Sequence, residues 1–289
     1  MKIKRTLQQL ARQAKGSFKT VHDREVIVKR LADYLQANNI QIKHIDHIKT
    51  KHIEGYIQSR QEQAISKRTL QNEMSAIRKT LTQAGREKLA NSERLSNQSL
   101  NIHNTSRQGT KTAITDEQFY EIVKTSIEKD QLGIAACLQL SRYLGLRGEE
   151  AVQSIQSLKT WQKAISQGKD TVTVVYGTKG GRPRQTRIIN QDKVKQAVDY
   201  AINIANQQNG KLIDKPSLKQ AMTYWRNHTA ALGLRGTISP HSLRYAYAHD
   251  GMQHYQEQGY SEKEALAMVS MDLGHGDGRG RYVKRVYAL

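Results

Sequence analysis

The sequence predicts a mainly α-helical protein of two domains, with one small antiparallel β-sheet in the second domain. Three observations support this prediction. Apolar residues recur at helical spacing over most of the chain, two β-rich runs flank a glycine-rich turn near residue 180, and a polar stretch near residue 100 interrupts the helical pattern. A chain of 289 residues is long enough for two domains that each bury a core.

The first domain, residues 1–100, is expected to be a bundle of short helices. Apolar residues at three- and four-residue spacing over 26–35 predict one amphipathic helix. Thr50 is expected to cap a second helix, and Ser66 to cap a third that ends at Gly85.

The ends of this domain are less regular. The basic residues within about 1–20 form either an extension that follows a polyanion or the solvated face of a further helix. Residues 101–112, rich in Asn, Ser, Thr and Gln, read as a linker.

The second domain, residues 113–289, mixes helices with a hairpin. Thr115 begins a helix with a capping pattern, and an apolar helix over 134–146 follows. The runs 171–176 and 185–189 are predicted strands around a turn with a basic tip, and the chain after residue 192 is helical again.

The charge of the chain predicts a polyanionic partner. It carries 46 Lys+Arg against 26 Asp+Glu, a formal net charge of +20, of which +12 falls within residues 1–110 and +8 beyond them. Neutralising phosphates releases condensed counterions, so nucleic acid is favoured over a protein that uses lysine for solubility alone. Because the excess is spread along the chain, both domains are expected to contact the polyanion.

Several classes of protein are excluded by what the sequence lacks. No apolar run is long enough to cross a bilayer, and the start of the chain does not read as a secretory signal. The single cysteine, Cys137, excludes an intramolecular disulfide and a cysteine-cluster metal site. Phosphate-loop, zinc-protease and dinucleotide motifs are missing as well. We therefore expect a soluble cytoplasmic protein that uses no cofactor and no metal.

A series of reactive residues stands at breaks between predicted elements. Arg147 follows the apolar helix, Lys179 lies at the hairpin tip, His241 and Arg244 follow Pro240 one helical turn apart, His275 follows Leu273-Gly274, and Tyr282 and Tyr287 lie near the end. Together they suit phosphoryl transfer without a metal. Arginines can fork onto phosphate oxygens, Lys or His can protonate a leaving oxygen, and a tyrosine hydroxyl can be the nucleophile.

This order of residues resembles the tyrosine recombinase (phage integrase) family. The matching pattern is Leu-Gly-Leu-Arg147-x-x-Glu150, Lys179 in a hairpin, His241-x-x-Arg244, Leu-Gly-His275 and a terminal tyrosine. The resemblance covers residues 112–289, and residues 20–85 are more loosely similar to the helical core-binding domain of that family. It therefore implies a DNA core-binding domain followed by a catalytic domain that breaks and rejoins DNA.

The resemblance also implies a role for each residue. Arg147 and Arg244 would clamp the scissile phosphate, and Lys179 would protonate the leaving 5′ oxygen. His241 would assist proton transfer at the tyrosine, and His275 would hydrogen-bond the phosphate. Glu150 would hold the arginine-bearing helix rather than react.

Two departures from the family pattern concern the nucleophile. The usual gap between Leu-Gly-His and the tyrosine falls between the two candidates. The local pattern favours Tyr287, with the glycine-rich run 276–281 as an insertion, while Tyr282 is the alternative and would need a shortened loop. The sequence also ends at Leu289, so the subunit-docking tail of many relatives is expected to be absent or replaced by another surface.

The expected function is site-specific DNA recombination through a 3′-phosphotyrosine, for integration or excision of a mobile element. The expected partners are double-stranded DNA, further copies of the chain in a tetramer on two paired sites, and an accessory DNA-bending protein, in association with the nucleoid. A non-catalytic DNA-binding protein and a type IB topoisomerase-like enzyme are the alternatives. Additional DNA contacts are expected from Lys67, Arg68, Arg78, Arg182 and Arg184.

Overall fold

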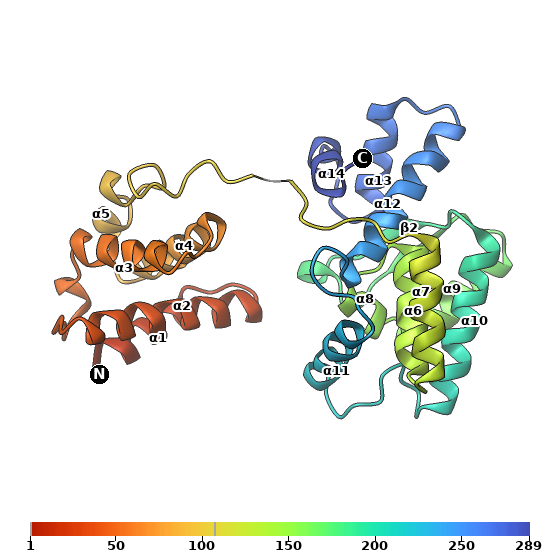
Figure 1. Cartoon of the computed structure of the whole chain (residues 1–289), viewed down its shortest axis with the longest axis horizontal. Helices are drawn as coiled ribbons and strands as arrows, with labels where there is room; N and C mark the ends of the chain where they lie inside the picture. The colour runs from red at the N-terminus through yellow and green to blue at the C-terminus, as the bar shows by residue number, and fades with distance from the viewer. Residues whose placement is uncertain (1, 107) are drawn as a thin grey trace. The chain divides into compact units, whose positions relative to one another are not determined.

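The computed structural model describes residues 2–106 and 108–289. The chain divides into two compact units, Met1–Ser106 and Arg107–Leu289 (Figure 1). The predicted linker, residues 101–112, spans this division, and its residue 107 lies outside the described residues. The predicted fold class, mainly helical with a small antiparallel sheet, is confirmed.

The amino-terminal unit is a bundle of helices around one apolar core. Ser17 and Ser66 cap two of its helices through their side chains, as expected of residues that satisfy free backbone N–H groups. Lys49 rather than Thr50 is the residue before another helix, so that helix begins one residue earlier than expected. The elements are α1 (Lys2–Gln13), α2 (Phe18–Ala37), the 3-10 turn η1 (Ile45–His47), α3 (Thr50–Glu62), α4 (Lys67–Gln83), α5 (Glu87–Ala90) and the 3-10 turn η2 (Glu93–Leu95).

Residues 2–13 form helix α1 and not a free extension. Ile3, Leu7 and Ala11 lie on one face of this helix and are buried in the core. Its basic residues are on the outside, where Lys4 pairs with Asp33 of α2. This segment is therefore a helix with one buried face and one basic face; residue 1 lies outside the described residues.

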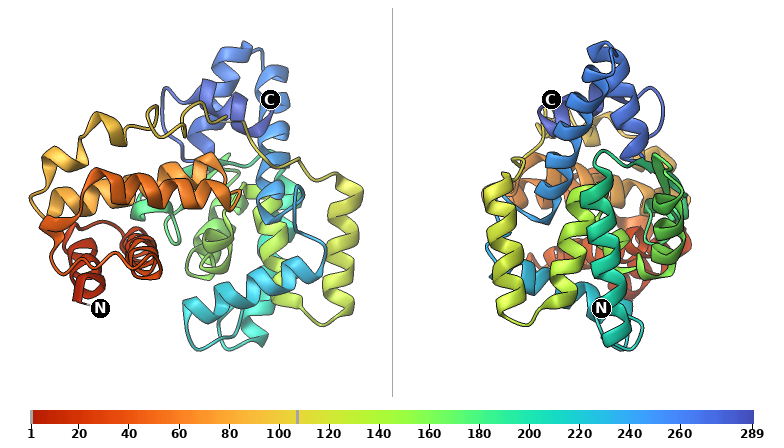
Figure 2. Two further views of the ribbon diagram at one scale, coloured as in Figure 1. Left: turned by 60° about the vertical axis from the view of Figure 1, so that its left-hand side comes forward. Right: turned by 90° about the vertical axis from the view of Figure 1, so that its right-hand side faces the viewer.

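The carboxy-terminal unit surrounds helix α7, which is buried along most of its length. Helices α6, α7 and α10 lie side by side in the right-hand view of Figure 2. The elements are α6 (Asp116–Glu128), α7 (Leu132–Leu144), α8 (Gly148–Val152), α9 (Ile155–Ser166), β1 (Thr171–Val174), the 3-10 turn η3 (Lys179–Gly181), β2 (Arg184–Arg187), α10 (Gln191–Gln207), α11 (Leu218–Ala231), α12 (Pro240–Glu257), α13 (Glu262–Asp272) and α14 (Gly280–Tyr287).

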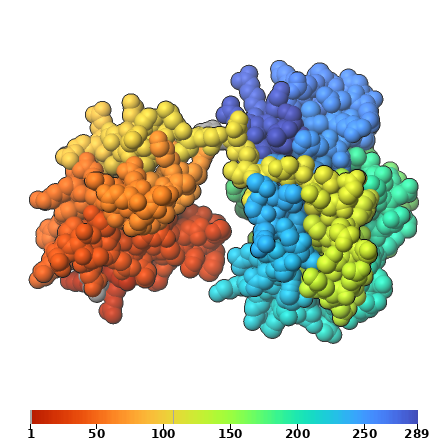
Figure 3. Space-filling model, viewed as in Figure 1, coloured from red at the N-terminus to blue at the C-terminus, as the bar shows by residue number. Residues whose placement is uncertain are grey.

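Helices α12, α13 and α14 carry a second apolar cluster of this unit. The dark-blue carboxy-terminal helix lies against the blue α13 in the space-filling view (Figure 3). Val283 and Tyr287 of α14 face this cluster and are buried, whereas the basic residues of the same helix lie outside. Within the described residues, no helix is long and apolar enough to cross a membrane.

The two predicted strands pair as an antiparallel hairpin. Val172 is opposite Thr186, and Val174 is opposite Arg184. Both strands are shorter than expected, because the first run turns toward solvent at residues 175 and 176. Gly177 has a φ of +71°, and a Cβ at this position would lie 2.5 Å from Glu149 O, so only glycine lets the turn lie this close to α8.

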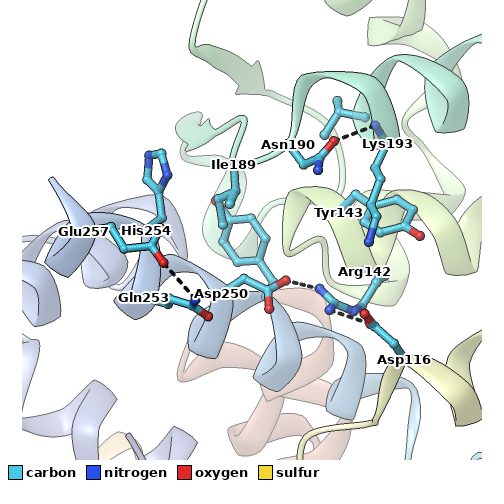
Figure 4. A pocket seen from close by; sticks show the side chains of 12 residues that line it. Asp116, Arg142, Tyr143, Ile189, Asn190, Lys193, Asp250, Gln253, His254 and Glu257 are labelled. Atoms are coloured by element: carbon cyan, nitrogen blue, oxygen red, sulfur yellow. Dashed lines mark hydrogen bonds and ion pairs between the residues drawn. The ribbon is translucent and has the colours of Figure 1, made fainter.

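Arg142 joins three helices of this unit at a cavity of about 280 Å³ (Figure 4). Its guanidinium projects from α7 and donates to Asp116 of α6, with Nη2 and Oδ1 2.9 Å apart, and to Asp250 of α12. Lys193 of α10 lies over the ring of Tyr143, 5.8 Å from its centre. These contacts fix α12, which carries Arg244, against α7, which ends three residues before Arg147.

Candidate active site

Arg147 is positioned by the end of one helix and the start of the next. Gly145, in the left-handed conformation with a φ of 57°, ends α7, and Arg147 is the residue before α8. The Glu150 carboxylate accepts both the backbone N–H of Arg147, at 2.8 Å, and its Nη1, at 2.6 Å. Although burial opposes ionisation, the charges of Arg184, Arg244 and Arg147 lower the pKa of Glu150 to about 2. Glu150 therefore holds Arg147 as an anion.

Arg184, which was predicted to contact DNA, is a third arginine at this place and is bound by protein groups. Its guanidinium is buried and donates to Glu150 Oε2 at 2.8 Å, to Gly145 O at 3.1 Å and to Asp272 O. Gly274 makes room for it, because a Cβ at that position would collide with the Arg184 side chain. Arg184 is thus a buried partner of Glu150.

Arg244 lies beneath the site and is fully buried. Its Nη1 and Nη2 donate to Gly145 O and Leu273 O, the carbonyl groups at the ends of α7 and α13. Its Nε donates to Tyr287 Oη at 3.0 Å. Burial lowers the pKa of Arg244 to about 10, which leaves the guanidinium positive at neutral pH.

His275 and Tyr287 meet directly. Gly274 ends α13 with a φ of +65°, and His275 follows it. Its Nε2 lies 3.0 Å from Tyr287 Oη. Tyr287 is the last residue of α14 and is only 1% exposed; the Tyr245 ring lies against it, with ring centres 4.6 Å apart.

Tyr282, the alternative nucleophile, lies on the outer side of the same helix. It is 39% exposed, and its ring stands edge-on to the His275 ring at 5.2 Å between centres. The phosphate-binding candidate Arg244 contacts the hydroxyl of Tyr287 and not that of Tyr282 among the described contacts.

His241 and Lys179 lie at the edges of the site. His241 is in the first turn of α12, and its ring centre is 6.0 Å from that of Tyr287. Lys179 is exposed in η3 and lines a cavity of about 900 Å³ together with Arg147 and His275. The structure therefore groups all six predicted reactive residues in one unit, and three of them, Arg147, Lys179 and His275, line the same cavity.

The remaining candidates for DNA contact differ in how exposed their side chains are. Lys67 and Arg68, in the first turn of α4, are exposed, and so is Arg182 beside Lys179. Arg78 is half-buried and donates to Leu95 O and to Asn97 Oδ1, at 2.9 Å in the latter case. Arg78 therefore stabilises the turn after η2, which makes it a poor candidate for binding phosphate.

Two features near the site escaped sequence analysis. Asp272, the last residue of α13, is buried and accepts a hydrogen bond from Tyr255 Oη at 2.7 Å, and burial raises its pKa to about 6. Gly109, inside the predicted linker, donates its N–H to Arg285 O of α14 at 3.3 Å. A Cβ on Gly109 would collide with Val286 O, so the backbone of this segment lies directly on the tyrosine helix. The glycine was the only signal of this approach, and a glycine in a polar stretch also suits an ordinary linker.

Two family models match this chain. One, described as "Integrase", matches residues 101–250, more than half of the sequence. This chain belongs to the tyrosine recombinase family of integrases. A second model, described as "Phage integrase, N-terminal", matches residues 1–90. The resemblance inferred from the order of reactive residues is thereby confirmed.

Solved structures of integrases share the fold. A lambda integrase tetramer bound to a Holliday junction aligns with 98% of this chain and 76% of that chain, at 15% identity and a TM-score of 0.63. The Tn1549 transposon integrase in complex with transposon right end DNA aligns with 100% of this chain and 95% of that chain, at 14% identity and a TM-score of 0.63. The XerH site-specific recombinase bound to difH substrate aligns with 92% of this chain and 75% of that chain, at 16% identity and a TM-score of 0.54. Among curated proteins, no sequence matches this chain.

Proposed function

We propose that this integrase is a site-specific recombinase that cuts and rejoins DNA strands through a covalent 3′-phosphotyrosine, with Tyr287 as the nucleophile. The observation that carries the proposal is the position of Tyr287 Oη, 3.0 Å from Arg244 Nε and 3.0 Å from His275 Nε2. A hydroxyl held between a cation and an imidazole is suited to nucleophilic attack on a phosphodiester.

Arg147 and Arg244 are the proposed phosphate clamp. Guanidinium groups fork onto the non-bridging oxygens and stabilise the charge that develops in the transition state. Arg147 is partly exposed at the 900 Å³ cavity, whereas Arg244 is fully buried and contacts Tyr287 Oη. A phosphate that enters from this cavity therefore reaches Arg147 first.

Lys179 is the proposed general acid for the leaving 5′ oxygen. It lies on the exposed hairpin turn, in the wall of the cavity that Arg147 and His275 share. A lysine on a short turn can follow the substrate and deliver its proton as the P–O5′ bond breaks. The ester bond to Tyr287 retains the energy of the broken phosphodiester, so rejoining needs no ATP.

Duplex DNA is the proposed substrate, and a homo-oligomer is the proposed active form. The net charge of +20 favours a polyanion. The lambda integrase of the matching structure is a tetramer on a Holliday junction, and the Tn1549 integrase is bound to transposon end DNA. By analogy, we propose a tetramer on two paired sites that integrates or excises a mobile element.

The test is a covalent protein–DNA adduct on nicked suicide DNA that carries the ends of the element. On a denaturing gel, the wild-type chain should give a shifted band that Tyr287→Phe abolishes and Tyr282→Phe retains. Loss with Tyr282→Phe alone would move the nucleophile to that residue. If the wild-type chain binds its cognate DNA and gives no adduct, the chain is a DNA-binding protein without strand-transfer activity.

A further inference from the structure

The hydrogen-bond roles around Tyr287 Oη identify where its proton points. Arg244 Nε can only donate, so the phenol oxygen is the acceptor of that 3.0 Å bond. The phenol has one hydrogen of its own, and His275 Nε2 lies 3.0 Å from the same oxygen. With the ring proton of His275 on Nδ1, Nε2 is an acceptor and both partners of this buried hydroxyl are satisfied.

His241 is less well placed for the same hydrogen. Its ring centre is 6.0 Å from that of Tyr287, with the two planes inclined at 42°, whereas His275 makes a direct contact. Among the described residues, the polar groups recorded within hydrogen-bonding distance of Tyr287 Oη are Arg244 and His275. His241 instead packs edge-on against the Tyr245 ring, at 5.6 Å between centres.

We infer that His275 is the general base that removes the proton from Tyr287 as it attacks the scissile phosphate. This inference rests on the proposed strand-transfer function. In the forward step the Tyr287 Oη–P bond forms, the P–O5′ bond breaks, the phenol proton passes to His275 Nε2, and the 5′ oxygen takes a proton from Lys179. In rejoining, both protons return by the same routes.

The positive charges that face His275 make its proton affinity depend on whether the DNA phosphate is bound. Burial, the positive charges of Arg244 and Arg147, and the neighbouring His241 and Arg184 lower the pKa of His275 to about 3, so the ring is neutral and its Nε2 can accept a proton. A DNA phosphate at the arginines adds a negative charge that offsets theirs. Protonation of His275 therefore becomes easier once the scissile phosphate is bound.

The geometry also allows one ring to serve both nucleophile and phosphate. When Nε2 accepts from Tyr287, Nδ1–H remains free to donate to an incoming phosphate oxygen from the cavity that His275 lines. The Tyr282 ring stands edge-on to His275 and limits its rotation. His275 is thus held with its two nitrogens assigned to different partners.

The test replaces Tyr287 with 3,5-difluorotyrosine, a more acidic phenol that needs a base less. Single-turnover cleavage of suicide DNA is measured for wild type, His275→Asn and His241→Asn, each with tyrosine and with difluorotyrosine at position 287. We expect His275→Asn to slow cleavage by about 10²–10⁴-fold with tyrosine, as for loss of a general base. With difluorotyrosine the deficit should shrink at least tenfold, while the deficit of His241→Asn should stay constant.

Lys179→Ala is the matched control, because it acts on the leaving oxygen and fluorination of the nucleophile should not restore it. DNA affinity and thermal unfolding are measured for every variant, and His275→Gln replaces His275→Asn if the latter does not fold. An unchanged His275 deficit, or a rescue confined to His241→Asn, overturns the inference. A wild-type chain that forms no adduct overturns the proposed function instead, so the two failures are distinguishable.

Discussion

Arg184 Nη2 and Glu150 Oε2 form an ion pair 2.8 Å long that is sealed from solvent, with side chains 6% and 0% exposed. Glu150 bonds Arg147 through its other oxygen, at 2.6 Å. A single buried carboxylate therefore connects a buried arginine to the partly exposed arginine at the mouth of the cavity. The position of Arg147 therefore depends on the buried Glu150.

Removal of Glu150 should destabilise the fold strongly. Glu150→Ala leaves the buried Arg184 without its counter-charge, and breaking such a pair costs about 3–5 kcal/mol. Chemical denaturation should detect this loss in the free energy of unfolding. The control is Glu149→Ala, the exposed neighbour, which should change stability by less than about 0.5 kcal/mol. Equal effects of the two substitutions would contradict the buried-pair interpretation.

The salt dependence of DNA binding should separate exposed from buried basic residues. Lys67→Ala should weaken binding and reduce the slope of log affinity against log salt by about 1, as for one lost phosphate contact. Arg184→Met should leave this slope unchanged because its guanidinium is buried. Fluorescence titrations at several salt concentrations measure both. A reduced slope for Arg184→Met would restore Arg184 as a DNA contact.

Asp272 should give the protein a stability that decreases as the pH rises. Burial raises its pKa from the ordinary 3.8 to about 6, so between these values the folded protein binds the extra proton and loses stability with rising pH. Two pKa units correspond to roughly 3 kcal/mol. Asp272→Asn still accepts the Tyr255 hydrogen bond and should gain stability relative to wild type between pH 4 and pH 7.

Urea denaturation at several pH values measures this difference for Asp272→Asn. The exposed Asp277→Asn serves as the matched control and should show a constant offset from wild type. A constant offset for Asp272→Asn as well would mean that Asp272 titrates as it does in the unfolded chain.

Gly109→Ala should impair catalysis more than binding. The added methyl group would collide with Val286 O and with the Tyr245 hydroxyl, and α14 must move to relieve the collision. Because a displacement of about 1 Å at a reacting group can cost 10²-fold, we expect cleavage to slow by about 10–100-fold with DNA affinity retained. Thr110→Ala, at the exposed next residue, is the control. Equal single-turnover rates for the two variants would refute this prediction.

The candidate reactive residues could be selected from the sequence because they stand at breaks between predicted elements. Gly145 and Pro240 punctuate the helices beside Arg147 and His241. The sequence favoured Tyr287 over Tyr282 through its local pattern alone, since the length of the glycine-rich loop does not fix where α14 begins. The structure starts this helix at Gly280, which turns Tyr287 inward and Tyr282 outward.

The sequence could not predict which individual charged side chains are buried. Residues 182 and 184 are both arginines on the same hairpin, and only packing against Gly274 and Glu150 decides which one turns inward. In α1, the apolar spacing of Ile3, Leu7 and Ala11 was present, yet the many lysines and arginines of the segment favoured an extension equally. Local sequence patterns identify helices and strands. The residue that pairs with a given charged side chain depends on how the whole chain folds.

The carbonyl groups of Gly145 and Leu273 accept hydrogen bonds from Arg244, and Leu273 O also accepts one from Arg147 at 3.3 Å. These oxygens occupy donors that the proposed reaction assigns to the phosphate. The guanidinium groups of Arg147 and Arg244 are therefore engaged by backbone oxygens of the protein itself. Phosphate binding becomes an exchange of one set of oxygens for another, and small free anions, which lack the binding energy of a long duplex, are poor competitors in that exchange.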